Sequence, residues 1–151
     1  MHAGQLTTRS RRVKMAVIGT RIGLCRSRSE ILARMRWLSA GPINGKRMDM
    51  SWIDETITFG DTERWTITVR DGTHTFHTHQ TQFQILEING EPPPPEDAGW
   101  EDTVLVTEGR EVVIAARFDS YTNPDVPYMF HCHVLDHEDL GMMGQFRVVA
   151  S

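Results

Sequence analysis

Short runs of β-branched and aromatic residues alternate with turn residues from about residue 55 to the end of the chain. Runs of this length and composition, bounded by Gly, Pro, Asn or Asp, are typical of β-strands. They lie at Thr56–Phe59, Arg64–Val69, Gln82–Ile88, Thr103–Val106, Glu111–Phe118, Tyr128–His133 and Gln145–Val149. Strands this short and this closely spaced predict an all-β fold, with the architecture of a Greek-key β-sandwich.

The segments between these runs carry residues that favour turns. They are Gly60-Asp61, Asp71-Gly72, Asn89-Gly90, Glu108-Gly109 and the loop around Asn123-Pro124. Four consecutive prolines, Pro92–Pro95, predict a stiff connection. A polyproline motif that binds a partner is the alternative for this run.

Length and charge divide the chain into two parts. The 151 residues have room for one domain with a substantial core, and no apolar run is long enough for a membrane helix, so we expect no membrane span. Residues 1–47 hold 11 Lys and Arg against one acidic residue, Glu30, whereas residues 48–151 hold 5 against 19. We therefore expect a basic leader over residues 1–42 and a folded domain over residues 43–151.

The basic leader is the less informative part. Its stretch from Glu30 to Leu38 is compatible with a short amphipathic helix, which makes the segment irregular or partly helical. A nucleic-acid arm, a membrane-surface helix and an export signal are alternatives. We favour a poorly ordered leader, or sequence left by truncation of a longer gene, and expect no nucleic-acid partner.

Histidines are concentrated in the second part. Six of the seven lie in two clusters about fifty residues apart, the first from His74 to His79 and the second from His131 to His137. Side chains alternate between the two faces of a strand, so His131 and His133 share one face and Cys132 takes the other. By the same parity, His77 and His79 share a face that His74 does not.

This parity predicts two groups of ligands on opposite faces of one sheet. The first group contains His74 and Cys132, to which the loop after the strand adds His137 and Met142. Two imidazoles, a thiolate and a weak thioether are the ligands of a blue copper site. The second group is His77, His79, His131 and His133, which suits a further copper or copper cluster. Zinc also accepts His and Cys ligands, but the methionine favours copper.

The two clusters read His-x-x-His-x-His and His-Cys-His-x-x-x-His-x-x-x-Gly-Met. With Gly60–Trp65, Gln82–Leu86, Gly99–Val104 and His137–Asp139, they resemble the C-terminal cupredoxin domain of bacterial multicopper oxidases, which include laccases, bilirubin oxidases, spore-coat laccases and cuprous oxidases. The resemblance extends from Ile43 to about Ala150 and implies a plastocyanin-like sandwich. It departs at Thr75, where the family usually has proline, and at Gln80, where it often has Gly or Asp.

The resemblance also implies a role for each ligand. His74, Cys132, His137 and Met142 would hold a type 1 copper. His77 would bind a type 2 copper, and His79, His131 and His133 a type 3 pair. Glu138 would relay protons, with a solvated acid as the alternative, and Asp102 would orient a ligand or a bound water, with a turn-capping carboxylate as the alternative. Copper at Cys132 would exclude a disulfide with Cys25.

In the family, single electrons pass from a reductant at the type 1 copper, through Cys132 and its histidine neighbours, to a trinuclear site that reduces dioxygen to water. Half of the trinuclear ligands come from an N-terminal cupredoxin domain, as two His-x-His pairs. This chain has one histidine outside the clusters, His2. We therefore expect a complete type 1 site and half a trinuclear site, in a domain that is inactive without a partner domain or subunit.

Three hypotheses follow. The chain is an oxidase domain, a stand-alone blue-copper electron carrier, or a truncated copper-binding domain without activity. For the first, the absence of a Met-rich segment and the Arg70-Asp71-Gly72 sequence before His74 favour a phenolic or bilirubin-like reductant over Cu(I). The family resemblance suggests an exported protein.

Overall fold

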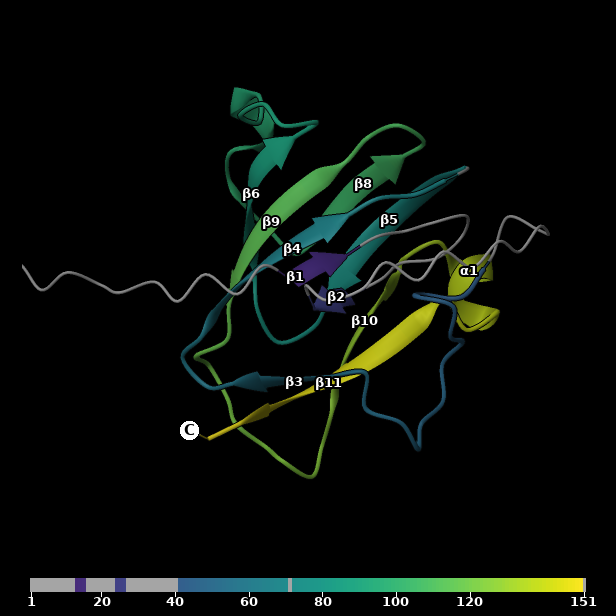
Figure 1. Cartoon of the computed structure of the whole chain (residues 1–151), viewed down its shortest axis with the longest axis vertical. Helices are drawn as coiled ribbons and strands as arrows, with labels where there is room; N and C mark the ends of the chain where they lie inside the picture. The colour runs from purple at the N-terminus through teal and green to yellow at the C-terminus, as the bar shows by residue number, and fades with distance from the viewer. Residues whose placement is uncertain (1–12, 16–23, 27–40, 71, 151) are drawn as a thin grey trace, which may run out of the picture.

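The computed structural model describes residues 13–15, 24–26, 41–70 and 72–150. Residues 41–150 form two β-sheets with one short helix beside them (Figure 1). Strand pairs are antiparallel except β3 with β11, which run parallel. The sequence prediction of an all-β sandwich is therefore confirmed.

The first sheet has five strands in the order β3, β11, β10, β5, β8. Their bounds are Glu55–Thr58, Met143–Val149, Tyr128–Cys132, Thr73–Thr78 and Thr103–Thr107. The helix α1, Leu135–Asp139, follows β10 almost directly. Strands β5 and β10 are neighbours although residues 79–127 lie between them in the sequence, and this pairing brings the two histidine clusters together.

The second sheet has four strands in the order β4, β9, β6, β7. Their bounds are Thr62–Ile67, Val112–Arg117, Phe83–Ile88 and Trp100–Glu101. After β6, Asn89 and Gly90 have φ of 53° and 83°. Two consecutive positive φ angles are typical of a type I′ turn, for which Asn-Gly is the preferred pair. The proline run then leads into a 3₁₀ turn, η1, at Pro95–Asp97.

Trp65 is the centre of the core between the sheets. It is 1% exposed and extends from β4 toward the other sheet. Its ring meets Phe76, Phe130 and Phe146 edge-on, at centroid distances of 6.2, 6.4 and 6.3 Å. Edge-to-face pairs at such distances are favourable beyond the area that they bury. The core therefore fixes β5, β10 and β11, the strands that carry or flank the histidine clusters.

Strand β11 also holds the loop that leads into β3. Gln145, 2% exposed, directs Nε2 at the carbonyl oxygens of Asp49, Met50 and Trp52, at 3.2, 3.0 and 2.6 Å. The Gln145 N–H donates to Asp54 Oδ2 at 2.9 Å. One buried amide thus replaces the regular pairing that this irregular segment lacks.

The predicted strands agree with observed ones to within two residues, but four observed strands, among them the two-residue β7, were not predicted. Strand β5 was not among the predicted strands, because His and Thr at alternate positions lack the apolar periodicity that marks a strand. Two short strands in the basic leader, β1 at Val13–Met15 and β2 at Leu24–Arg26, were also not predicted. The proposed helix Glu30–Leu38 lies outside the described residues. Among the described residues, no helix is both long and apolar enough to cross a membrane.

Candidate metal centres

The pairing of β5 with β10 brings the candidate ligands together. His131 is opposite His77, and Cys132 is opposite Phe76. Paired residues in an antiparallel sheet point to the same face. Cys132 therefore points with Phe76 into the apolar core, and His131 points with His77 to the other face. The structure has the two-sided arrangement expected from strand parity.

The first cluster contains His74, Cys132 and His137. The Cys132 Sγ atom is 3.5 Å from Nδ1 of His74 and 3.5 Å from Nδ1 of His137. Helix α1 supplies His137, and β5 supplies His74, which is 1% exposed. All three ligand atoms lie within 4.8 Å of one another, in a site almost closed to solvent.

Met142 lies beside this cluster. Its side chain is fully buried in the same core group as Cys132. Its carbonyl oxygen accepts from the Cys132 N–H at 3.1 Å, and its N–H donates to the His137 carbonyl at 3.0 Å. These two bonds fix the turn from α1 into β11, so the backbone of Met142 is tied to two members of the cluster.

The protonation of Cys132 depends on two opposing effects. Burial raises the pKa of its thiol, because a thiolate is poorly solvated there. Hydrogen bonds from the backbone N–H groups of Val134 and Thr75 and from the Thr75 side chain lower the pKa. Cys132 is a free thiol and not part of a disulfide. A metal that binds here must displace the thiol proton.

The second cluster contains His77, His79 and His131. The Nε2 atoms of His79 and His131 are 3.2 Å apart. His133 adjoins the group, with ring centroids 5.4 Å from His77 and 5.3 Å from His131. Burial lowers the pKa of His79 and of His131. Both rings therefore favour the neutral form, which is the form that binds metals.

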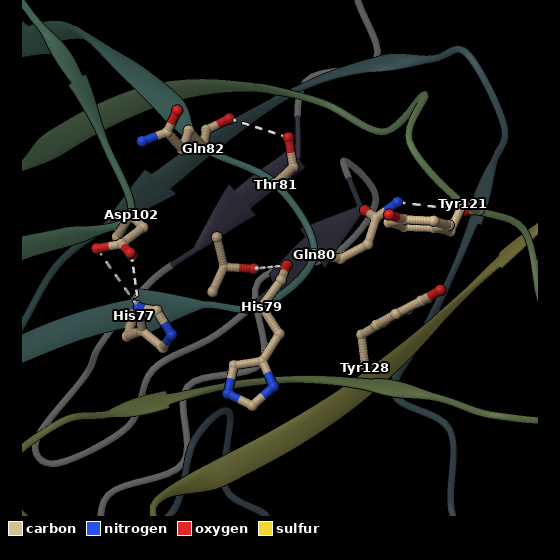
Figure 2. Close-up of a pocket in the computed structure, with 9 residues that line it drawn as sticks. His77, His79, Gln80, Thr81, Gln82, Asp102, Tyr121 and Tyr128 are labelled. Carbon is tan, nitrogen blue, oxygen red and sulfur yellow. Dashed lines mark hydrogen bonds and ion pairs between the residues drawn. The ribbon is translucent and has the colours of Figure 1, made fainter.

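His77 is oriented by two oxygen atoms of β8 and the residue before it. Its Nδ1 is 2.8 Å from the Asp102 carbonyl oxygen and 3.0 Å from Thr103 Oγ1. The Asp102 carboxylate oxygen Oδ1 lies 3.8 Å from the same nitrogen. Figure 2 shows Asp102 and His77 facing each other, joined by dashed lines. An Nδ1–H bonded to oxygen leaves Nε2 as the lone-pair nitrogen that a metal needs. Asp102 thus acts on His77 through its main chain as well as its carboxylate.

Glu138 faces the same cluster from α1. Its Oε2 atom is 3.4 Å from Nδ1 of His131. The His131 side chain is 5% exposed and that of Glu138 is 30% exposed. The carboxylate therefore lies between a buried ring and solvent, which is a suitable position for an acid that exchanges protons with the site.

The distances within both clusters fit metal coordination. Bonds of about 2.0 Å to nitrogen and 2.3 Å to sulfur separate two ligand atoms by roughly 3.3–3.8 Å at tetrahedral to trigonal angles. The observed 3.5, 3.5 and 3.2 Å are close to this range. The first donor set, with one sulfur and two nitrogens, suits copper or zinc, and the all-imidazole second set suits either metal too.

The second cluster opens into a cleft of about 530 Å³. Figure 2 shows His77, His79, Tyr121 and Tyr128 around it. Gln80 Nε2 donates to the Tyr121 carbonyl oxygen at 3.2 Å across one side. The other residues that line the cleft are Thr78, Thr81, Gln82 and Asp102. The imidazoles of His77 and His79 are therefore accessible from this cleft.

The sequence did not indicate two of these residues as parts of a site. Thr103 contacts His77 only because β5 and β8 pair, with His77 opposite Thr103. Tyr121 is in the loop between β9 and β10, and its position at the cleft depends on the path of that loop. Thr103 lies in the segment Gly99–Val104 that resembles the family, but nothing in that segment marks it as a partner of His77, and Tyr121 lies in no such segment.

Comparison with known proteins identifies relatives of the chain. The family model described as multicopper oxidase matches residues 26–151. The multicopper oxidase mco of Staphylococcus haemolyticus is 40% identical over 111 residues, which are 70% of this chain and 24% of that protein. The laccase of Bacillus subtilis is 37% identical and covers 67% of this chain and 23% of its own length. The chain spans about a quarter of the length of these relatives.

Solved structures agree with this result. A laccase-like multicopper oxidase, CueO from Ochrobactrum, superposes with a TM-score of 0.67 and 44% identity, covering 72% of this chain and 24% of its own. A multicopper oxidase from Pediococcus acidilactici gives 0.72 and 26% identity, over 98% of this chain and 28% of its own. These similarities confirm the cupredoxin type of the sandwich, and they support copper as the metal.

Some relatives are named for a different role. The cell division protein FtsP of Escherichia coli is 37% identical over 127 residues, which are 80% of this chain and 26% of that protein. Similarity alone therefore leaves activity open, and the ligand residues must decide it. The match over residues 26–151 nevertheless settles the family: this chain belongs to the multicopper oxidases.

Proposed function

We propose that the chain is the C-terminal copper domain of a laccase-like multicopper oxidase. The observation that carries the proposal is the division of six ligand residues between two faces of one β5–β10 pair. An ordinary structural histidine needs one hydrogen-bond partner and no second imidazole. Here six ligand atoms converge in two groups of three, each within 4.8 Å. Convergence of this kind on both faces of a strand pair is best explained by two metal centres.

The first cluster is proposed as the type 1 site. His74, Cys132 and His137 would be the three strong ligands, with Met142 as the weak axial one. The support is the pair of 3.5 Å distances to Sγ, the near-complete burial and the backbone link from Cys132 to Met142. Burial protects a copper–thiolate bond from water and from oxidation of the sulfur.

The second cluster is proposed as half of a trinuclear site. His77 would bind the type 2 copper, and His79, His131 and His133 would bind the type 3 pair. The remaining ligands would come from a partner cupredoxin domain or subunit with two His-x-His pairs, docked over the open cleft. The coverage of only about a quarter of the relatives' length supports a need for further domains.

Copper bound in these sites would supply one-electron oxidation of a reductant and reduction of dioxygen to water. Cys132 is bonded through the main chain to both His131 and His133, so covalent bonds connect the two clusters. Glu138 would hold a proton beside His131, at 3.4 Å from its Nδ1. Asp102 would orient His77 through its carbonyl oxygen, at 2.8 Å.

The proposed reductant is a phenolic or bilirubin-like molecule. The Ochrobactrum protein, 44% identical, acts on lignin model compounds, which supports an aromatic donor. Export from the cytoplasm is proposed from the same kinship with laccases. A blue electron carrier is the second candidate, but a carrier does not need the four imidazoles of the other face. A domain without activity is the third candidate. The similarity to FtsP, which is named as a cell division protein, is the reason to test it.

The test is to load the full chain with copper and record its visible spectrum and copper content. We expect an intense blue band and about one firmly bound copper, with the second cluster filled after a partner with two His-x-His pairs is added. Oxygen uptake with a phenolic donor should appear only with that partner. A colourless loaded chain would refute the proposal, and a blue chain that never consumes oxygen with any such partner would favour the carrier.

A further inference from the structure

Gln80 follows His79 at the point where the chain leaves the second cluster. Its φ is 75°, in the left-handed region that residues other than glycine rarely adopt. A residue in such a conformation persists because the surrounding structure holds it there. The His79 N–H donates to the Met129 carbonyl oxygen at 2.8 Å, so β10 fixes the residue before Gln80. From this fixed point the Gln80 side chain extends toward Tyr121, as Figure 2 shows.

The side-chain amide of Gln80 bonds the loop over residues 119–127, between β9 and β10. Its Nε2 atom donates to the Tyr121 carbonyl oxygen at 3.2 Å. A carbonyl oxygen only accepts, so the nitrogen of the amide must be the atom that faces it. In the described part of the chain, residues 119–122 make no backbone–backbone hydrogen bond. The Gln80 amide is therefore the group that ties Tyr121 to the segment after β5.

The second half of the loop is held in another way. The Asn123 N–H donates to the Val148 carbonyl oxygen at 3.2 Å. Its Oδ1 atom accepts from the N–H groups of Asp125 and Val126, at 3.0 and 3.2 Å. These bonds do not involve Gln80, so loss of the Gln80 amide would release only the first half of the loop.

The Gln80–Tyr121 bond lies between two clefts. Residues 80–82 line the cleft beside the second cluster and also a neighbouring cleft of about 490 Å³. Tyr121 lines the first cleft, and Ser120, the residue before it, lines the second. The bond thus joins the two segments that separate these clefts. Without it, the loop could move away from residues 80–82 and let the clefts merge.

We infer that Gln80 is a positioning residue for the second cluster, whose amide holds the first half of the loop as a fixed wall and closes the neighbouring cleft off from His77 and His79. The bond does not depend on a metal. The inference rests on the proposed function only in treating the second cluster as half of a trinuclear site. A partner domain docks with less loss of conformational entropy against a wall that is already ordered. Its ligands would then approach the two imidazoles from the open side alone.

The test measures the access of a small reagent to each histidine in the metal-free full chain. Diethyl pyrocarbonate carbethoxylates neutral imidazoles, and tandem mass spectrometry of the peptides gives a rate for each ring. Gln80→Met keeps the length of the side chain and adds no charge, but it removes the donor. Gln80 Oε1 is buried without a hydrogen-bond partner among the described residues, so the change breaks one side-chain bond only.

We expect His77 and His79 to react several-fold faster in Gln80→Met, because the loop no longer shields them. Gln82→Met makes the same change at another residue of the same cleft and should leave both rates as in the wild type. His74, which is 1% exposed, is the internal reference, because a general loosening of the fold would raise its rate as well.

Unchanged or slower rates at His77 and His79 in Gln80→Met would overturn the inference. An equal rise at His74, or in Gln82→Met, would overturn it too, because the effect would not be specific to the bond. If Gln80→Met does not fold, Gln80→Asn replaces it. Asparagine tolerates a positive φ, its amide is one methylene shorter, and the same rise is required. A colourless copper-loaded chain would instead refute the proposed function, and it would leave these metal-free rates unaffected.

Discussion

His131 and Cys132 are consecutive in β10, yet their side chains belong to ligand clusters on opposite faces of the sheet. One peptide bond separates a nitrogen ligand of the second cluster from the sulfur ligand of the first. Each of these two residues can therefore be changed with a direct effect on its own cluster.

Replacement of Cys132 by serine should abolish the blue colour of the copper-loaded chain. A serine hydroxyl does not form the copper–thiolate bond that gives a type 1 site its colour. The measurement is the visible spectrum near roughly 600 nm, the region of blue-copper absorption for this class of site. His131→Ala is the matched control, because it alters the other face and should leave the band in place. A serine variant that stays blue would remove Cys132 from the site.

Replacement of Met142 by leucine should keep the copper and raise its reduction potential. The thioether is a weak donor to Cu(II), and its loss destabilises the oxidised state. Met143→Leu is the control, because the next residue in β11 lies on the other side of the strand and is only partly buried. Redox titration of the two variants gives the comparison. Loss of all copper in Met142→Leu would mean that the methionine is a strong ligand.

The isolated chain should bind about one copper firmly and any others weakly, because the second cluster has ligands from one domain. A partner with two His-x-His pairs should raise copper content and oxygen uptake together. A homodimer in which two second clusters face each other is the alternative source of ligands. Metal analysis measures the copper content, and sedimentation measures the oligomeric state. Four coppers per unaided monomer, or oxygen reduction by two identical chains, would contradict the half-site.

Replacement of Gly144 by alanine should destabilise the fold. A Cβ at this position would lie 2.3 Å from the Phe130 ring and 3.0 Å from Asp54 Oδ2. Overpacking of a core costs about 1–3 kcal/mol, and urea unfolding of the metal-free chain measures it. Gly99→Ala is the control, since a Cβ there meets its nearest atom at 3.7 Å, an ordinary contact. Equal stability of the two variants would show that Phe130 can move aside.

Replacement of Gln145 by methionine should loosen the loop that leads into β3. The change keeps most of the volume but leaves the carbonyl groups of Asp49, Met50 and Trp52 without their shared donor. Loss of a buried donor costs about 1–3 kcal/mol, and hydrogen exchange should rise in residues 49–54 first. Gln84→Met on an exposed position of β6 should change little. If hydrogen exchange in residues 49–54 is the same in Gln145→Met and in Gln84→Met, Gln145 does not hold this loop.

Local patterns in the sequence were sufficient for much of the fold. The turn at Asn89-Gly90 follows from residue type, because both positions need positive φ. The division of His131 and Cys132 between two faces follows from alternation alone. Such features depend on neighbours in the chain, and the printed sequence contains them in full.

Other features depend on pairing between distant segments. Nothing near His77 indicates that Thr103 lies opposite it, because that contact requires the β5–β8 register. In the sequence, Gln145 is an ordinary strand residue. Its role follows only from its hydrogen bonds to the loop from Asp49 to Trp52. The candidate ligands could be predicted because they lie in short sequence motifs of metal-binding residues. The residues that support them are identified only by the tertiary structure.

The alternation of β10 also limits how this strand can vary in length. Insertion or loss of one residue between Tyr128 and Cys132 would turn every following side chain to the opposite face. The sulfur would then point away from His74 and His137, and the two imidazoles beside it would point into the core. The loop over residues 119–127, by contrast, can absorb changes of length without disturbing this parity. Related chains should therefore differ in the loop and keep the number of residues in the strand.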